Sequence, residues 1–122
     1  MDGNKKSFLF EISGAVVEGK KKATALGYPT ANIVCESDVP GGIYAGDVTW
    51  KGISYPAAIY KEDRKNIIEA HLLDFSGNLY GEALTFRAFQ KIREVKTFAS
   101  QEDLVAAIAH DIEIIKKLCS QE

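Results

Sequence analysis

The chain has 122 residues, of which 46% are hydrophobic and 26% are charged. This is the composition of one ordinary globular domain, and it excludes disordered, collagen-like and disulfide-scaffold proteins. Fifteen basic and 17 acidic side chains give a net charge of −2, so we expect neither nucleic acid nor an anionic membrane as a partner. No stretch approaches the roughly 18 apolar residues of a membrane span, and the polar start lacks the apolar core of a signal peptide. We therefore expect a cytoplasmic protein.

Short apolar runs, separated by glycine and proline, predict a mainly β structure from residue 8 onward, after a short tail at residues 1–7. Six such runs at about ten-residue spacing, without alternating helices, are typical of a closed or nearly closed antiparallel barrel. Lys51-Gly52 predicts a two-residue hairpin turn between the third and fourth strands. The expected strands cover residues 8–17 with a break at Gly14, 31–35, 42–50, 53–60, 67–75 and 84–92.

The end of the chain has a helical pattern. Ser100 is a capping residue with the acidic Asp103 three positions later, which is a helix start signal. The pattern predicts one C-terminal α-helix of about 18 residues that packs on the six-stranded antiparallel barrel, within a single domain over residues 8–119. Its apolar stripe consists of Leu104, Ile108, Ile112, Ile115 and Cys119.

A basic segment that begins at Gly19 is the first candidate for function. Its three lysines, Lys20, Lys21 and Lys22, are typical of a solvated loop. Further on, Thr30 and Asn32 lie two residues apart, so an extended chain places both side chains on one side. Their neutral oxygens could share one Mg²⁺ with water and phosphate oxygens, although Thr and Asn also suit ordinary turns.

Three further positions could carry chemistry. Glu69 and His71 share one face of the fifth expected strand. If that face points into the barrel, Glu69 is a candidate acid or base, because an unpaired buried carboxylate is costly; the alternative is that both side chains face solvent. Tyr80-Gly81 could be only a kink where a strand begins, and Arg93 only a surface cation.

Taken together and in order, these segments resemble riboflavin kinase (flavokinase). The resemblance runs from about residue 8 to residue 118, and the Leu-Gly-aromatic-Pro-Thr-Ala-Asn string is its most specific part. The matching segments are Ile12-Ser13-Gly14-x-Val16-Val17-x-Gly19, Leu26-Gly27-Tyr28-Pro29-Thr30-Ala31-Asn32-Ile33, Gly42-Ile43-Tyr44, Glu69-x-His71-Leu72-Leu73-Asp74-Phe75, Leu79-Tyr80-Gly81-Glu82, and Ile92-Arg93-x-x-x-x-Phe98 followed by Leu104, Ile108 and Asp111.

The resemblance implies the same barrel with a C-terminal helix, and an enzyme that transfers the γ-phosphate of ATP to the 5′-hydroxyl of riboflavin, giving FMN. It implies that Thr30 and Asn32 meet phosphate and Mg²⁺, or another divalent metal, and that Glu69 is the catalytic base. Tyr80-Gly81 would shape the adenine side, and Arg93 would lie by the flavin. The loop over the nucleotide phosphates would contain Gly19, Lys20, Lys21, Lys22, Ala23 and Thr24.

The sequence departs from the family pattern in two loops. Ala23 and Thr24 stand where the family has a Gly-Arg pair, and the segment at residues 58–66 is shorter and lacks the family's Gly and Pro. Glycine allows backbone amides to approach phosphates closely, whereas the lysines would act as point charges. Thr30, Asn32 and Glu69 nevertheless favour a stand-alone, monomeric riboflavin kinase without a fused adenylyltransferase domain, and this is what we expect. The altered loops favour the alternatives, which are a flavin- or nucleotide-binding relative without kinase activity and a kinase-like barrel that acts on another small hydroxylated substrate.

Overall fold

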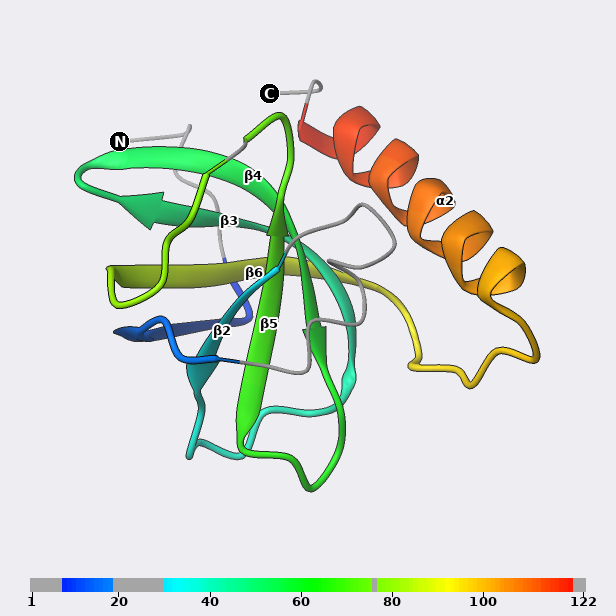
Figure 1. Ribbon diagram of the computed structural model, residues 1–122, viewed down its shortest axis with the longest axis horizontal. Coiled ribbons are helices and arrows are strands. Elements are labelled where there is room, and N and C mark those ends of the chain that lie inside the picture. Colours follow the sequence, from blue (N-terminus) through cyan, green and yellow to red (C-terminus); the bar gives the residue numbers. More distant parts are fainter. Residues whose placement is uncertain (1–7, 19–29, 76, 120–122) are drawn as a thin grey trace.

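The computed structural model describes residues 8–18, 30–75 and 77–119, and it has six strands and the helix α2 (Figure 1). The predicted tail at residues 1–7 and the basic segment at residues 19–24 lie outside the described residues. The elements are β1 (Phe10–Ala15), β2 (Ala31–Val34), β3 (Gly42–Trp50), β4 (Ile53–Lys61), β5 (Ile67–Leu72), β6 (Ala83–Arg93) and α2 (Gln101–Cys119).

The six strands form one antiparallel sheet in the order β1-β6-β3-β4-β5-β2. The two ends of this order meet at an isolated bridge between Val17 and Asn32, so the sheet curls into a nearly closed barrel. Lys51 and Gly52 connect β3 to β4 with φ values of 50° and 80°. Two positive φ values are typical of the hairpin turn predicted at this position. The predicted mainly β fold with one C-terminal helix is confirmed.

The expectations for the first and fifth strands are partly wrong. β1 covers Phe10–Ala15 and not residues 8–17, and it runs without a break through Gly14, because Gly14 pairs with Leu84 in an uninterrupted register with β6. β5 ends at Leu72 and not at Phe75, because the chain turns away there: Asp74 has a φ of 55°, which is incompatible with a strand.

The β4–β5 connection turns without the glycine expected for a loop of this kind. Arg64 has a φ of 69°, in the left-handed region that glycine adopts most easily. Asp63 next to it accepts a hydrogen bond from the backbone N–H of Gly41 at 2.9 Å. The loop is therefore fixed to the start of β3 although it carries backbone strain at Arg64.

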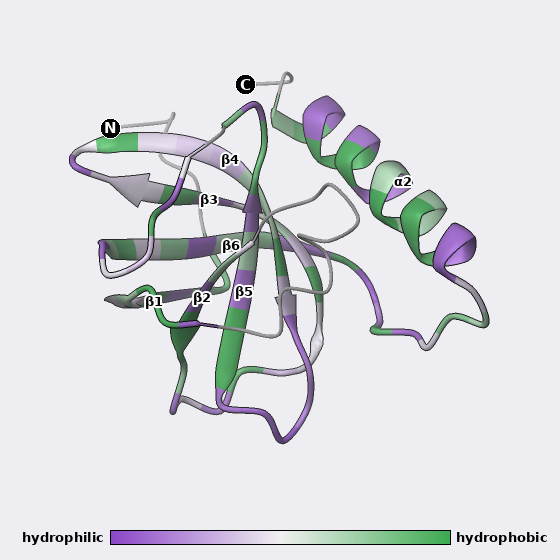
Figure 2. Cartoon of the chain, viewed as in Figure 1, coloured by the Kyte–Doolittle hydropathy of each residue, from purple (hydrophilic) through white to green (hydrophobic). Residues whose placement is uncertain are grey.

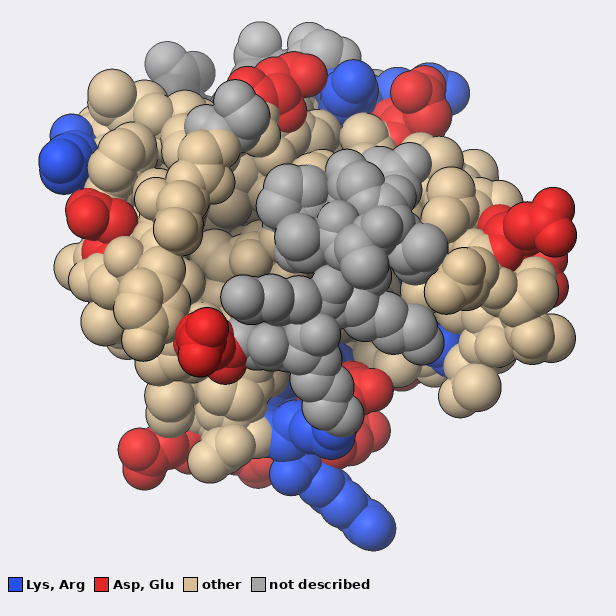
Figure 3. Space-filling view, viewed as in Figure 1, with Lys and Arg blue, Asp and Glu red and all other residues tan. Residues whose placement is uncertain are grey.

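The main core fills the barrel. It is built from small and branched side chains that alternate along the strands with residues of the outer face. Its fully buried members include Ile33, Val48, Ile59, Ile68 and Phe86. Figure 2 shows hydrophobic and hydrophilic residues alternating along the strands, and Figure 3 shows acidic and basic side chains intermixed around one face of the molecule.

Helix α2 packs on the outside of the barrel, against β3 and β4. The hydroxyl of Ser100 accepts a hydrogen bond from the N–H of Asp103 at 3.1 Å, which confirms the predicted N-cap. A second apolar cluster joins Ile115 of the helix to Ala45, Ala58 and Leu73. The described part of the chain contains no helix with the length and apolar character of a membrane span.

Candidate active site

Five residues on the outer face of the barrel lie in one row across five neighbouring strands. Each is the direct cross-strand partner of the next, so their side chains leave the sheet on the same side. Adjacent strands lie about 4.8 Å apart, so the row spans about 19 Å. From β2 through β5, β4 and β3 to β6 the row consists of Asn32, Glu69, Tyr60, Ile43 and Arg93. Three of the five are residues that the sequence predicted for the site.

Asn32 begins the row and is 4% exposed. Its side-chain oxygen Oδ1 is buried and has no hydrogen-bond partner within the described residues. A buried amide oxygen without a partner is unfavourable unless something else binds it. Thr30, two residues earlier, is half-buried. The described residues contain no group of three His, Cys, Asp or Glu side chains that could hold a metal ion.

Glu69 follows Asn32 in the row and is half-buried on β5. Ile68, Ala70 and Leu72 of the same strand point into the barrel core, so Glu69 points outward. Of the two alternatives left open by the sequence, the one in which this face points into the barrel is excluded, because the apolar residues of β5 occupy that side. Glu69 is nevertheless not a fully exposed side chain, since it stands beside the buried Asn32.

Arg93 ends the row and is held by a buried carboxylate of helix α2. Its Nε donates to Oδ1 of Asp111 at 2.9 Å and its Nη2 donates to Oδ2 at 2.8 Å. Asp111 is completely buried. The Nη1 group donates to the carbonyl of Glu94 at 3.0 Å, and the ring of Phe98 lies 5.7 Å from the guanidinium. Hydrogen bonding to Asp111 raises the pKa of Arg93 above its usual value, against the opposing effect of burial.

The turn at Tyr80-Gly81 lies at the other end of the row. The N–H of Gly81, which has a φ of 82°, donates to the carbonyl of Val16, and the N–H of Val17 donates to the carbonyl of Asn32. These two hydrogen bonds, through the neighbouring residues Val16 and Val17, connect the Tyr80-Gly81 turn to Asn32 at the beginning of the row. Tyr80 itself is 62% exposed. The spatial order is thus Tyr80-Gly81, then Asn32, Glu69 and finally Arg93.

The sequence did not identify Tyr60, and it did not identify Asp111 as the partner of Arg93. Tyr60 is half-buried between Glu69 and Ile43 and packs against the cluster beneath helix α2. No motif points to it. A signal for Asp111 does exist: it lies at helical spacing between Ile108 and Ile115, both buried. A carboxylate on the apolar stripe of a helix indicates a buried partner.

Comparisons with known proteins identify the family of this chain. The riboflavin kinase family model matches residues 6–119. The chain belongs to the riboflavin kinase family. Within it, the bifunctional riboflavin kinase/FMN adenylyltransferase of Pseudomonas fluorescens is 39% identical over 120 residues, which cover 91% of this chain and 39% of the relative.

Solved structures also match this member of the riboflavin kinase family. Riboflavin kinase from Trypanosoma brucei superposes with a TM-score of 0.67 at 26% identity, over 90% of this chain and 79% of that protein. A macrolide-efflux protein from Streptococcus pneumoniae superposes with a TM-score of 0.74 at 27% identity, over 87% of this chain and 36% of that one. The chain spans 38–42% of the length of three curated bifunctional relatives.

Proposed function

We propose that this protein is a riboflavin kinase, which transfers the γ-phosphate of ATP to the 5′-hydroxyl of riboflavin and gives FMN and ADP. The order of residues along the outer row carries this proposal. The predicted adenine turn adjoins Asn32, a possible metal ligand, and the predicted base Glu69 is next to it. Arg93, the predicted flavin residue, lies about 14 Å beyond Glu69, three strand spacings away. A nucleotide at one end and a flavin at the other would meet at Glu69.

Glu69 would act as the general base. Its carboxylate accepts the proton of the ribityl 5′-hydroxyl while that oxygen forms a bond to the γ-phosphorus. The bond from the γ-phosphorus to the β–γ bridging oxygen breaks, and ADP leaves with the bonding electrons. Phosphoryl transfer of this kind depends mainly on positioning and on neutralisation of charge. The position of Glu69 beside Asn32 supports this role because the proton acceptor and the phosphates must be close together.

The residues present fit a bound Mg²⁺. The buried Oδ1 of Asn32 is a hard neutral ligand without a partner in the described part of the chain, and Thr30 can supply a hydroxyl beside it. Bound there with ATP, Mg²⁺ would neutralise the charge that develops on the phosphoryl oxygens. Asn32 and Thr30 would hold it, and Glu69 would accept the proton.

The remaining assignments follow the family pattern. The loop residues Gly19 to Thr24 would cover the phosphates, Tyr80-Gly81 would border the adenine, and Arg93 would contact the flavin. We further propose one riboflavin-kinase-like domain over residues 8–119, a monomer that binds ATP and riboflavin and no nucleic acid or membrane, and a cytoplasmic location. A cytoplasmic location agrees with the use of ATP and with Cys35, which is a buried free thiol.

The decisive experiment is an assay of FMN formation from riboflavin, ATP and Mg²⁺, first with the wild type and then with Glu69→Gln. We expect the wild type to form FMN and Glu69→Gln to lower kcat by about 10²-fold or more, because general-base catalysis contributes that much. Riboflavin and ATP affinities should remain within about threefold, because the substitution preserves shape.

The matched control is Glu11→Gln, the same change on the outer face of β1, opposite Arg87. We expect this control to turn over at the wild-type rate. If both variants are equally active, Glu69 is not the base. If the wild type forms no FMN, the proposed function is wrong.

A further inference from the structure

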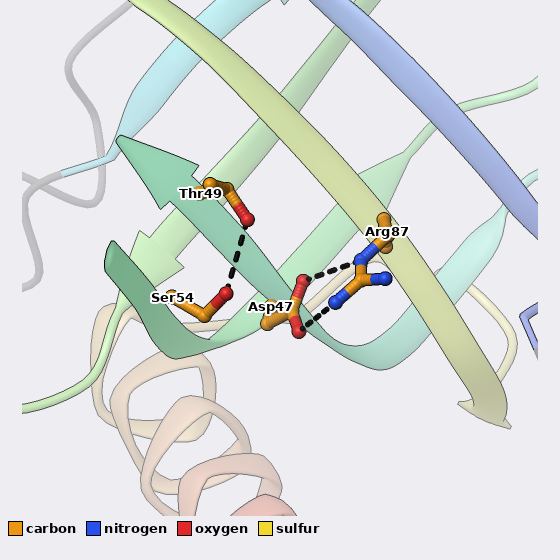
Figure 4. A network of polar contacts seen from close by, with 4 residues as sticks. All are labelled: Asp47, Thr49, Ser54 and Arg87. Atoms are coloured by element: carbon orange, nitrogen blue, oxygen red, sulfur yellow. Dashed lines mark hydrogen bonds and ion pairs between the residues drawn. The ribbon is translucent and has the colours of Figure 1, made fainter. Parts of the chain in front are cut away.

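The fold contains two arginine–aspartate pairs with the same geometry but different surroundings. Arg87 and Asp47 pair across β6 and β3 on the outer face, with Nε and Nη2 donating to the two carboxylate oxygens at 3.2 and 3.0 Å (Figure 4). Arg93 and Asp111 pair between β6 and helix α2 at 2.9 and 2.8 Å. The Asp47 side chain is 15% exposed, whereas the Asp111 side chain is 1% exposed.

Burial makes the second pair costly. A buried carboxylate has lost its hydration, and only the attraction to its partner can offset that loss of free energy. Replacement of such a pair by apolar side chains is therefore often neutral or favourable for stability. Ile108 and Ile115, which flank Asp111 on the helix, show that an apolar side chain suits this face of α2. Stability alone therefore gives no reason for an aspartate at this position.

The hydrogen bonds of Arg93 show that Asp111 helps to fix the orientation of the Arg93 guanidinium. A guanidinium has five N–H donors in one rigid plane. Two of them bind Asp111 and one binds the carbonyl of Glu94, so within the described part of the chain two N–H groups remain for a ligand. The Arg93 side chain is 23% exposed, so it is not sealed inside the protein. Because the plane is fixed at three points, the direction of these two donors is fixed as well.

We infer that Asp111 is a positioning residue for the acceptor substrate: it acts through Arg93, whose two remaining N–H groups it holds toward the carbonyl oxygens of the flavin ring. This inference rests on the proposed function. Asp111 does not itself touch the substrate. It fixes the orientation of Arg93 before riboflavin arrives, which lowers the entropic cost of binding. The effect concerns the flavin end of the row and leaves the nucleotide end unchanged.

The test is a comparison of binding constants for riboflavin, from quenching of its fluorescence, and for Mg·ATP, from calorimetry. Asp111→Asn should weaken riboflavin binding about tenfold and leave Mg·ATP binding within about twofold, because it loosens one orienting contact. Asp47→Asn is the matched control: the same change in the same geometry, away from the row, which should alter neither constant. A purely structural role for Asp111 predicts equal loss of both ligands.

A double-mutant cycle separates the route through Arg93 from other routes. Arg93→Lys keeps a cation beside Asp111, so this variant should fold even if Asp111→Asn does not. The lysine side chain lacks the planar N–H donors of the guanidinium. Arg93→Lys should weaken riboflavin binding at least tenfold, and adding Asp111→Asn should cause no further loss. Additive losses, or unchanged riboflavin binding in Arg93→Lys, overturn the inference. If these variants bind riboflavin normally while the wild type forms FMN, only the inference fails; if the wild type binds no riboflavin, the proposed function and the inference both fail.

Discussion

Gly46 leaves less room for a side chain than any other described glycine, so it offers a sharp test of the fold. It lies on β3 beside a register shift against β6. A Cβ at this position would lie 2.0 Å from the carbonyl oxygen of Arg87 and 2.7 Å from Cδ1 of Ile59. To reach the 3.4 Å of ordinary van der Waals contact, the β6 backbone would have to recede by about 1.4 Å. A flexible side chain could move aside, but a paired backbone carbonyl cannot.

We therefore expect Gly46→Ala to destabilise the protein by about 3 kcal/mol or more. Overpacking typically costs about 1–3 kcal/mol, and separation of the strands also weakens ladder hydrogen bonds of about 1 kcal/mol each. The matched control is Gly14→Ala on β1, where the nearest atom to the new Cβ is Cβ of Ile33 at 3.5 Å. Gly14→Ala should be neutral or stabilising by about 0.5 kcal/mol, because alanine loses less backbone entropy than glycine.

The free energy of unfolding can be measured by urea titration, with the fluorescence of the single tryptophan, Trp50, as the signal. The two variants should differ by at least about 3 kcal/mol. A difference below about 1 kcal/mol would show that β3 and β6 are not packed as closely as the structure places them.

Two further substitutions test other parts of the structure. Asn32→Ala should weaken Mg·ATP binding, measured by calorimetry, at least tenfold. The free energy of unfolding should change by less than about 1 kcal/mol, because the lost oxygen has no partner in the described fold. A large loss of stability would instead assign Asn32 a structural role. Arg64→Gly should stabilise the protein against urea by about 0.5–1 kcal/mol, since it relieves the left-handed conformation in an exposed loop; lower stability would contradict this source of strain.

The sequence by itself determined the local features of this protein. Alternating and interrupted apolar runs predicted the six strands, Lys51-Gly52 predicted a hairpin turn, and Ser100 predicted the start of α2. These features depend on residues close together in the chain, where spacing and backbone preference decide the outcome. The errors, at Gly14 and at the end of β5, arose where a strand's extent depends on its neighbours.

Only the tertiary structure decided how the candidate site is assembled. Asn32, Glu69 and Arg93 come from strands that are distant in the sequence, and they form one row because closure of the barrel sets the register of every strand pair. A shift of one residue in any pair would turn one of these side chains to the opposite face. The pairing of Arg93 with Asp111 likewise depends on where α2 docks. Short-range patterns contain no information about such long-range registers, because the registers result from packing across the whole barrel.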